Sequence, residues 1–414
     1  MKKNWLLRNK KLGGIPVTRT LIEYYDKDVL KNIMGPLTLH PDKVIFLYDS
    51  GMQDMTAFRA LHTCFKRHIP HITLEKYPVD ILSMDKIYRK TAQVIENNEN
   101  CFLELTGGSE LMVIAGFRAG MEKGARLIHT DLVHNRITDL LTDETVAPTA
   151  TLSLEDFVDA RGACFIGESH RPPEPARFDA IWEMARYLFR HLEEWKHTCS
   201  YLQTVAARYL PHEVYMDSKE QIYMKNGKKT YPDKAILKEF QRLGFLKNLV
   251  MDGERVRFSF CSVDDRQYCT GYGVWLELYV YIAAKKSGVF DDVKLGTMID
   301  WNAYDGVVVA GNEIDVILME QSLPVFISCK LRSADTAALN ELLIAKKRVG
   351  GWFSKGVMVT FSREKAENSG TYKRAQELGI ELLDAGDILA EDFPARLVRA
   401  IKEHDLVSLK WKKV

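Results

Sequence analysis

The sequence predicts an α/β protein in three parts. These are an N-terminal Rossmann-like domain at residues 1–150, a linker with a winged-helix-like module at residues 151–268, and a C-terminal α/β domain at residues 269–414. Three observations support this prediction. The chain of 414 residues is longer than a single hydrophobic core usually serves. Short apolar runs alternate with helical patterns from Thr18 onward. Acidic, hydroxyl and basic side chains then recur at strand spacing in the last third of the chain.

The composition is that of an ordinary folded protein without a strong overall charge. Hydrophobic residues make up 46% of the chain and charged residues 27%, which excludes a disordered or collagen-like protein. The 57 Lys and Arg residues almost balance the 56 Asp and Glu residues, which leaves a formal net charge of +1. A polyanionic partner would therefore have to meet local basic patches rather than a global field.

The cysteines and the apolar runs indicate the compartment. The 7 cysteines are scattered singly without a C-x-x-C pair, which argues against a disulfide framework and against a zinc site. No stretch approaches the roughly 18 apolar residues of a membrane span, and the basic N-terminus lacks a sustained apolar region. We therefore expect a reduced, soluble and cytoplasmic protein with no membrane partner.

The first domain is predicted to alternate strands and helices. Strands are expected at Thr20–Tyr25, Val44–Tyr48, Ile69–Tyr77, Cys101–Leu105 and Arg126–His129. Helices are expected at Lys27–Met34, Asp54–Arg67, Ile81–Asn97 and Ser109–Lys123. Uninterrupted apolar strands that alternate with helices are typical of a parallel sheet covered on both faces. The pattern therefore indicates a Rossmann-like fold.

A ligand site is expected where the first and fourth strands end, because loop amides and helix N-termini converge there. The candidate binding residues are Tyr25, Asp26, Asp49, Thr106, Gly107, Gly108, Ser109 and Glu110. The two glycines allow a ligand to approach the backbone, and Ser109 can cap a helix whose free N–H groups attract phosphate. A merely structural glycine turn is the alternative. The chain has neither G-x-G-x-x-G nor G-x-x-x-x-G-K-[ST], which disfavours an NAD enzyme and a P-loop ATPase.

The middle part predicts a winged-helix outline. Linkers are expected at 143–148 and 171–175, helices from Phe178 to Leu210, and then a helix at 231–246 before a hairpin that turns at Asp252-Gly253. Such a module either reads DNA or acts as a spacer. The candidate recognition segment mixes acidic and basic residues, namely Lys234, Lys238, Glu239, Arg242 and Lys247. This mixture favours the spacer.

Glu277 is the informative residue of the helix that begins near Gly271 and runs to about Lys286. The residues three, four and seven positions later are Val280, Tyr281 and Ala284. The carboxylate therefore lies on an apolar stripe, where it needs a partner. A nearby Lys or Arg is the ordinary partner, and a metal site is the functional alternative.

Two strands supply the other members of a cluster. In Asn312–Met319, Glu313 and Asp315 alternate with apolar residues, and in Pro324–Lys330 the residues Ser328 and Lys330 do the same. If 320–323 form the turn, Met319 faces Pro324. The register then places Asp315 opposite Ser328 and Glu313 opposite Lys330.

This cluster fits a divalent-metal site, since hard cations such as Mg²⁺ or Mn²⁺ take oxygen ligands. A bound metal beside a lysine can activate water and neutralise charge on a phosphate. The alternative is a surface hairpin with a cross-strand ion pair. A helix at 336–348 and a strand at 357–360 are expected to follow. Lys346, Lys347 and Arg348 end that helix and suit phosphate contacts, although the helix dipole also favours cations there.

With these motifs the chain resembles the CRISPR ancillary nucleases that join a CARF domain to a PD-(D/E)xK nuclease domain. The resemblance rests on Thr20–Tyr25, Leu105–Glu110 and Asn312–Lys330. It implies a restriction-endonuclease-like C-terminal domain and a homodimer that binds a cyclic oligoadenylate, most often cyclic tetra-adenylate, as an allosteric activator. It also implies metal-dependent cleavage of single-stranded DNA or RNA, with nicking of supercoiled DNA in some relatives.

One residue departs from the family pattern, because Ser328 stands where the motif has Glu or Asp. By the resemblance, Asp315 is the principal metal ligand, Glu277 a second ligand or water orienter, and Glu313 an auxiliary ligand. Lys330 positions the nucleophile or stabilises the transition state. Asp300 and Asp305 are weaker candidates.

The rival hypothesis is a transcription regulator. In it, a sensing Rossmann dimer acts through the winged helix, and the last domain has lost catalysis. Glu277, Asp315 and Lys330 favour the enzyme, whereas Ser328 favours the regulator.

Overall fold

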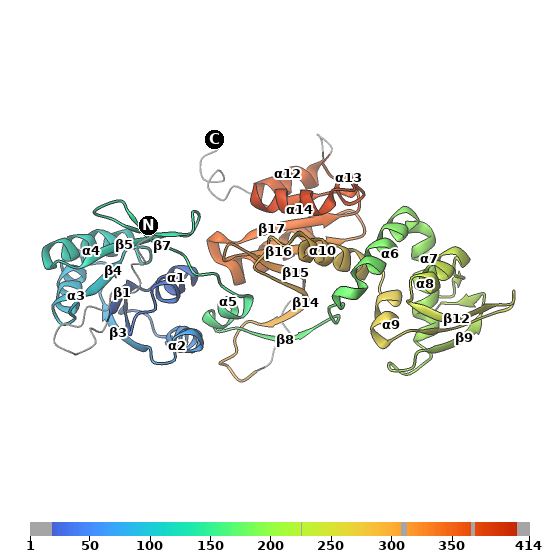
Figure 1. Ribbon diagram of the computed structural model, residues 1–414, viewed down its shortest axis with the longest axis horizontal. Coiled ribbons are helices and arrows are strands. Elements are labelled where there is room, and N and C mark those ends of the chain that lie inside the picture. The colour runs from blue at the N-terminus through green and yellow to red at the C-terminus, as the bar shows by residue number, and fades with distance from the viewer. Residues whose placement is uncertain (1–18, 225, 308–312, 366–368, 404–414) are drawn as a thin grey trace. The chain divides into compact units, whose positions relative to one another are not determined.

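The structure is a computed structural model that describes residues 19–224, 226–307, 313–365 and 369–403 (Figure 1). The chain divides into a first unit, Met1–Phe165 with Asp300–Val309, and a second unit, Ile166–Ile299 with Ala310–Val414. The predicted boundary at residue 268 falls inside helix α9 (Val263–Thr270) of the second unit. The division into three parts at residues 150 and 268 stays a prediction.

The first unit contains a seven-stranded sheet in the order β3-β2-β1-β4-β5-β6-β7. Five strands are parallel, namely β1 (Thr20–Tyr24), β2 (Lys43–Asp49), β3 (Thr73–Val79), β4 (Cys101–Glu104) and β5 (Arg126–Asp131). The connecting helices are α1 (Leu30–Leu39), α2 (Thr56–His68), α3 (Met84–Glu96) and α4 (Glu110–Lys123). The predicted Rossmann-like fold is therefore confirmed, and β1 and β4 lie at the point where the strand order reverses.

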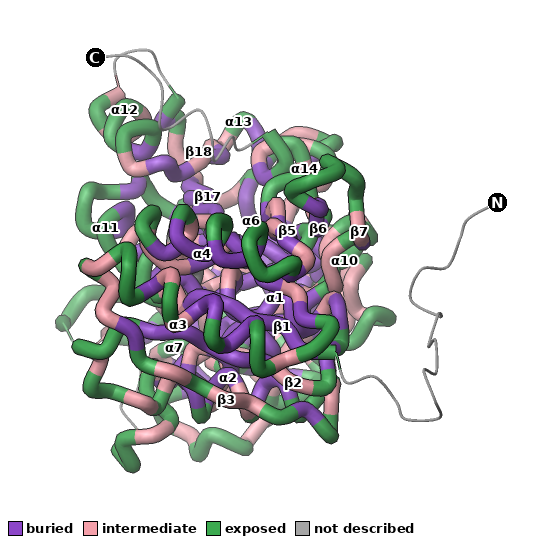
Figure 2. Tube along the Cα trace, turned by 90° about the vertical axis from the view of Figure 1, so that its left-hand side faces the viewer, coloured by how far each residue is buried: buried purple, intermediate pink, exposed green. Residues whose placement is uncertain are grey.

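Helices cover both faces of this sheet. The helices α3 and α4 pack on Ile22, Tyr24, Leu47 and Leu103. On the other face, Phe58 of α2 lies against Phe46, and Gly35 of α1 lies against buried side chains of β1 and β4. The helix α5 (Leu154–Ala160) packs on α2. In Figure 2 the strand β1 is purple along its length, as expected for a strand covered on both faces.

The predicted linker at 143–148 is wrong in part, because residues Thr145–Pro148 form strand β7. It pairs antiparallel with β6 (Arg136–Asp139), which in turn pairs antiparallel with β5. Asn135 and Asp143 have φ angles of 51° and 57°, typical of tight turns. These turn residues and the polar four-residue strands gave the segment the pattern of a linker rather than of a sheet edge.

Residues 166–268 of the predicted middle part lie in the second unit, whereas residues 151–165 belong to the first. Residues 166–268 contain α6 (Phe178–Arg190), α7 (Leu192–Ala206), α8 (Lys234–Arg242) and the sheet β12-β13-β9. These strands are β9 (Tyr215–Lys219), β12 (Leu246–Met251) and β13 (Arg255–Phe260). The predicted hairpin at Asp252-Gly253 is confirmed, with a φ of 92° at Gly253. A small ladder joins β10 (Ile222–Tyr223) to β11 (Lys229–Thr230).

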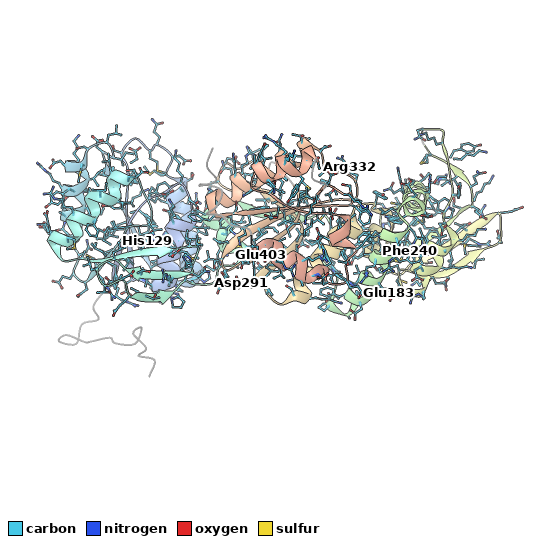
Figure 3. All side chains as sticks on the ribbon, turned by 90° about the horizontal axis from the view of Figure 1, so that it is seen from above. His129, Glu183, Phe240, Asp291, Arg332 and Glu403 are labelled. Carbon is cyan, nitrogen blue, oxygen red and sulfur yellow. The ribbon has the colours of Figure 1, made fainter. Side chains whose placement is uncertain are left out.

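A six-stranded sheet in the order β18-β17-β16-β15-β14-β8 forms the rest of the second unit. Its strands are β8 (Cys164–Glu168), β14 (Asp292–Asp300), β15 (Glu313–Glu320), β16 (Leu323–Lys330), β17 (Lys355–Thr360) and β18 (Glu381–Leu383). Its helices are α10 (Val274–Ser287), α11 (Thr336–Ala345), α12 (Gly370–Glu377), α13 (Ala385–Ile388) and α14 (Phe393–Lys402). One hydrophobic core runs from Ile181 to Ile401 and includes Phe240 of α8 (Figure 3). The winged-helix-like part and this sheet therefore share a single core.

The register predicted for the hairpin β15–β16 is confirmed, since Met319 pairs with Pro324. The turn is shorter than predicted, because Glu320 and Leu323 also pair. Only Gln321 and Ser322 remain in the turn, with φ angles of 50° and 66°. Two positive φ angles match the right-handed twist of a two-residue hairpin.

Candidate functional site

Asp315 lies at the centre of the side chains that β15 and β16 bring together. Its Oδ2 accepts hydrogen bonds from the backbone N–H of Cys329 at 2.7 Å and from the Ser328 hydroxyl at 3.2 Å. The Lys330 ammonium lies 3.6 Å from the same oxygen. The predicted neighbourhood of Asp315, Ser328 and Lys330 is therefore observed. Ser328 donates to the carboxylate, which holds Asp315 in place.

Glu277 reaches the same region from α10, and its side chain is only 14% exposed. The residues Val280, Tyr281 and Ala284, with which it shares a stripe, are buried. Burial raises the pKa of Glu277 to about 8, and the negative charges of Asp315 and Glu313 add to the rise. Its Oε2 has no hydrogen-bond partner among the described groups. A buried carboxyl group without a partner is the arrangement expected of a ligand site.

His170 joins this cluster, and sequence reasoning missed it. It follows β8, and its Nε2 lies 3.8 Å from Oε2 of Glu277. Its Nδ1 is buried and has no hydrogen-bond partner among the described groups. Burial lowers the pKa of His170, against the opposing effect of the Glu313 and Asp315 charges. A single histidine at the edge of a predicted linker, more than a hundred residues before Glu277, carries no local signal.

The donor set suits a divalent cation. One ligand atom each from His170, Glu277 and Glu313 lie within 4.8 Å of one another. Asp315 is outside this set of three, although its charge acts on Glu277 and His170. Carboxylate oxygens suit Mg²⁺ and Mn²⁺, and an imidazole nitrogen is a ligand more typical of transition metals. The orphaned atoms of Glu277 and His170 are consistent with a cation that would satisfy them.

A cleft of about 270 Å³ opens beside the hairpin. It is lined by Glu313, Ile314, Asp315, Ile327, Ser328, Lys330, Glu341, Leu342 and Ala345. Glu341 comes from α11 and was not among the predicted residues. Its helical position at a solvent-exposed site gave no reason to single it out. The cleft places the Lys330 ammonium beside the acidic residues and open to a substrate.

The prediction of a basic cluster at 346–348 is wrong for Lys346. This residue is buried, its Nζ donates to the carbonyl of Gly379 at 3.0 Å, and burial lowers its pKa to about 8. Lys347 and Arg348 are exposed. The helix ends at Ala345 and continues as a π-turn, which rotates Lys346 inward.

The two weaker candidates take part in local turns of the first unit. Asp300 is buried and accepts from the N–H of Asn302 at 3.1 Å. Asp305 is exposed and accepts from the N–H of Val307 at 2.8 Å. Both carboxylates therefore have the ordinary role of Asp in turns.

The two loops predicted to bind a ligand contact each other. Gly108 N–H donates to Asp26 Oδ2 at 3.2 Å, and the same oxygen binds the Lys31 ammonium at 2.9 Å. A methyl group at Gly107 would lie 2.5 Å from the carbonyl oxygen of Tyr24. At Gly108, where φ is 84°, it would lie 2.7 Å from Tyr24 Cβ. The structural reason for both glycines is thus the close approach of the loop to β1.

The remaining candidate residues around the loops differ in their contacts and in their exposure to solvent. Ser109 caps α4 as predicted, since its Oγ accepts from the N–H of Met112 at 3.3 Å. Tyr25 packs its ring 5.0 Å from that of Phe58, and Thr106 hydrogen-bonds to Glu104. Asp49 and Glu110 are exposed. Asp49 and Glu110 therefore have the most exposed side chains among these candidates.

The winged-helix-like part has little free positive charge on α8. Arg242 forms ion pairs with Glu239 at 2.5 Å and with Glu183, and Lys234 pairs with Glu220 at 2.7 Å. Ion pairs within the chain reduce the charge that a phosphate backbone would meet. This favours the spacer over a DNA reader.

The comparisons with known proteins agree with the fold and with an endonuclease-type domain in the last third of the chain. Residues 264–391 match the family described as "Card1-like, endonuclease domain". By sequence, no curated protein matches the chain. No helix among the described residues is both long and apolar enough to cross a bilayer.

Three solved structures resemble the chain. The protein VC1899 from Vibrio cholerae superposes with a TM-score of 0.74 at 15% identity, over 93% of this chain and 98% of that one. Can2 from Sulfobacillus thermosulfidooxidans, solved in complex with cyclic tetra-adenylate, gives 0.67 at 18% identity, over 94% and 99%. A type III CRISPR defence DNA nuclease activated by cyclic oligoadenylate gives 0.50 at 16% identity, over 84% of this chain and 47% of that one. These identities are low, and the likeness is one of fold.

Proposed function

We propose that the chain is a metal-dependent nuclease of type III CRISPR defence, because it joins a Rossmann-like sensor fold to a Card1-like endonuclease domain and resembles Can2 in fold. A cyclic oligoadenylate, with cyclic tetra-adenylate the first candidate, activates it, and single-stranded DNA or RNA is its substrate. The observation that carries this proposal is the convergence of His170, Glu277 and Glu313 beside the Asp315–Lys330 pair. These groups lie in a domain that matches an endonuclease family.

The residues of the cluster have different proposed roles in metal binding and in catalysis. His170, Glu277 and Glu313 would hold Mn²⁺ or Mg²⁺, with Asp315 completing the negative charge around it. Such a cation, when bound, supplies an activated water and neutralises charge on the phosphate. Asp315 keeps Lys330 at the mouth of the cleft, where the ammonium stabilises negative charge that develops on the phosphate oxygens. Ser328 orients Asp315 through the hydrogen bond that its hydroxyl donates to the carboxylate.

The test is a cleavage assay with the full chain. Labelled single-stranded DNA and RNA are incubated with Mn²⁺ or Mg²⁺, each with and without cyclic tetra-adenylate, and supercoiled plasmid is included as a third substrate. We expect degradation that requires both the metal and the cyclic nucleotide. Absence of cleavage with every substrate, metal and cyclic oligoadenylate would favour the transcription regulator. Cleavage at the same rate with and without the cyclic nucleotide would contradict the proposed activation.

The proposed assembly is a homodimer formed through α4. This helix begins at the ligand loop and exposes an apolar stripe along one face, seen partly as green segments in Figure 2. The stripe consists of Leu111, Ile114, Phe117 and Met121. Exposed apolar stripes of this kind are typical of interaction surfaces. A second copy seated there would bring two ligand loops to one two-fold axis.

Replacing Phe117 by aspartate is expected to weaken the dimer by roughly a hundredfold, because a charge would be buried in an apolar interface. Sedimentation velocity over a concentration series measures the change. Leu210→Asp is the matched control, since Leu210 is a similarly exposed apolar residue of the second unit. A Phe117→Asp protein that dimerises as tightly as the control would move the interface away from α4.

A further inference from the structure

Two glutamates lie side by side inside the sheet of the first unit. Glu23 of β1 and Glu104 of β4 are register partners on neighbouring parallel strands, and they are only 2% and 1% exposed. In the same row, Phe46 of β2 pairs with Glu23 and Ile128 of β5 pairs with Glu104. Apolar side chains therefore flank the two carboxyl groups. Two buried negative charges in such surroundings would be strongly unfavourable.

The helix α1, which packs on the two glutamates, has a glycine, Gly35, at the point of contact. A methyl group at Gly35 of α1 would lie 1.8 Å from Glu104 Oε2 and 2.8 Å from Glu23 Oε1. Both carboxyl groups therefore occupy the space that a side chain would fill at this position. Both oxygens of Glu23 and Oε2 of Glu104 have no donor among the described groups. An ionised carboxylate only accepts hydrogen bonds, so the two groups can bond to each other only when one carries a proton.

The other oxygen of Glu104 holds the ligand loop. Glu104 Oε1 accepts from the Thr106 hydroxyl at 2.9 Å and from the Thr130 hydroxyl at 2.5 Å. The Thr106 oxygen in turn accepts from the N–H of Thr130 at 2.8 Å. Thr106 is the second residue of the loop that follows β4 and continues through the two glycines to the cap of α4. Glu104 therefore fixes the start of this loop to β4 and β5.

The charged groups around the pair compensate its negative charge only in part. On β5 the neighbouring titratable group is His129 (Figure 3), which acts on Glu104 through its charge. On α1 the ammonium of Lys31 is bound to Asp26, and on β2 Lys43 lies 3.4 Å from Glu75. Burial raises the pKa of both glutamates. The charge of Glu104 raises that of Glu23 further, whereas the threonine hydrogen bonds lower that of Glu104.

We propose that Glu23 and Glu104 share one proton, carried mainly by Glu23, and that this acid pair is a positioning element of the ligand loop. The protonated carboxyl of Glu23 donates to Glu104, which stays in place as the acceptor for Thr106 and Thr130. Loss of the proton leaves two negative charges between apolar side chains, so the carboxylates separate. Glu104 then no longer holds Thr106 and Thr130 in place. The consequence for cyclic oligoadenylate rests on the proposed function, but the shared proton does not.

The first experiment needs no ligand. Infrared difference spectra of the full chain at neutral pH, wild type minus Glu23→Gln, are expected to show a band of a protonated carboxylic acid. In melting experiments from acidic to alkaline pH, the variant is expected to gain stability over the wild type as the pH rises. This sign follows because the unfolded chain ionises Glu23 at ordinary pH while the folded protein does not. Glu144→Gln, at an exposed glutamate, is the control. Absence of the band, together with wild-type and Glu23→Gln stabilities that change in parallel with pH, would contradict the shared proton.

The second experiment measures binding of cyclic tetra-adenylate by calorimetry over the same pH range. The wild type is expected to lose affinity at alkaline pH, and Glu23→Gln, which keeps a donor toward Glu104, is expected to bind equally at all pH values. Glu104→Ala removes the acceptor and is expected to weaken binding roughly tenfold at neutral pH. If nothing binds while the infrared band is present, the proposed ligand fails and the acid pair stands. Equal affinity for all three proteins at every pH would overturn the positioning role.

Discussion

Replacing Asp315 by asparagine is expected to lower the rate of nucleic-acid cleavage by roughly a hundredfold to a thousandfold. The amide keeps the shape of the side chain but loses the charge that lies 3.6 Å from the Lys330 ammonium. Its carbonyl oxygen can still accept the hydrogen bonds that Cys329 and Ser328 now donate to Oδ2, so the loss of the charge is the main effect. The measurement is the single-turnover cleavage rate with saturating metal and cyclic nucleotide.

Two companion variants make this prediction specific. Lys330→Met is expected to cause a loss of the same order, because the ammonium is the cation that lines the cleft beside Asp315. Lys373→Met removes an exposed lysine of α12 and is the matched control for charge and length. Binding of the cyclic nucleotide should be unchanged in all three proteins. An Asp315→Asn protein that cleaves at the wild-type rate would place the chemistry elsewhere.

Replacing Glu277 by glutamine is expected to abolish cleavage and, at the same time, to stabilise the metal-free protein at neutral pH. Burial raises the pKa of Glu277 to about 8 in the folded state, whereas the unfolded chain ionises at an ordinary value of about 4.3. Between these values the unfolded state has lost a proton that the folded state keeps, so wild-type stability falls as the pH rises. The variant does not titrate and is spared this loss, which amounts to a few kcal/mol at most.

Thermal melting in the presence of a chelator, followed across this pH range, measures the effect. Below about pH 4 the two proteins should differ little, because Glu277 is protonated in both states of the wild type. The gain of the variant should grow up to about pH 8 and then level off. Added Mn²⁺ should raise the melting temperature of the wild type and have little effect on Glu277→Gln. A variant less stable than the wild type at every pH would show that Glu277 has a structural partner.

Periodicity predicted those elements that are buried on both faces. The strands β1, β2, β4 and β5 and the hairpin β15–β16 are largely buried and carry apolar runs, whereas the edge strand β3 is mostly exposed or half-buried. From the hairpin register alone, Asp315 was expected opposite Ser328, and their hydrogen bond is observed. The strands β6 and β7 at one end of the sheet were missed because they are short and half polar, so turn residues dominated their pattern.

The residues that sequence reasoning missed owe their place to tertiary structure. His170 meets Glu277 only because β8 joins the far edge of a sheet whose other strands begin at Asp292. Lys346 turned inward because a single π-turn changes which side chains face the core. Glu23 and Glu104 lie inside the predicted strands Thr20–Tyr25 and Cys101–Leu105, and only the strand order reveals that the two carboxyl groups are neighbours.

The six-stranded sheet of the endonuclease-type domain includes a strand, β8, that lies far upstream of the other strands in the sequence. Residues 264–391 match the endonuclease family, yet β8 and His170 lie about a hundred residues before that segment. A fragment confined to the matched residues would expose the backbone of β14 as an unpaired edge, and unpaired edges recruit other strands. The segment matched by sequence similarity is therefore shorter than the fragment that is expected to remain free of aggregation. Excision, fusion or domain exchange in this chain should begin upstream of Cys164.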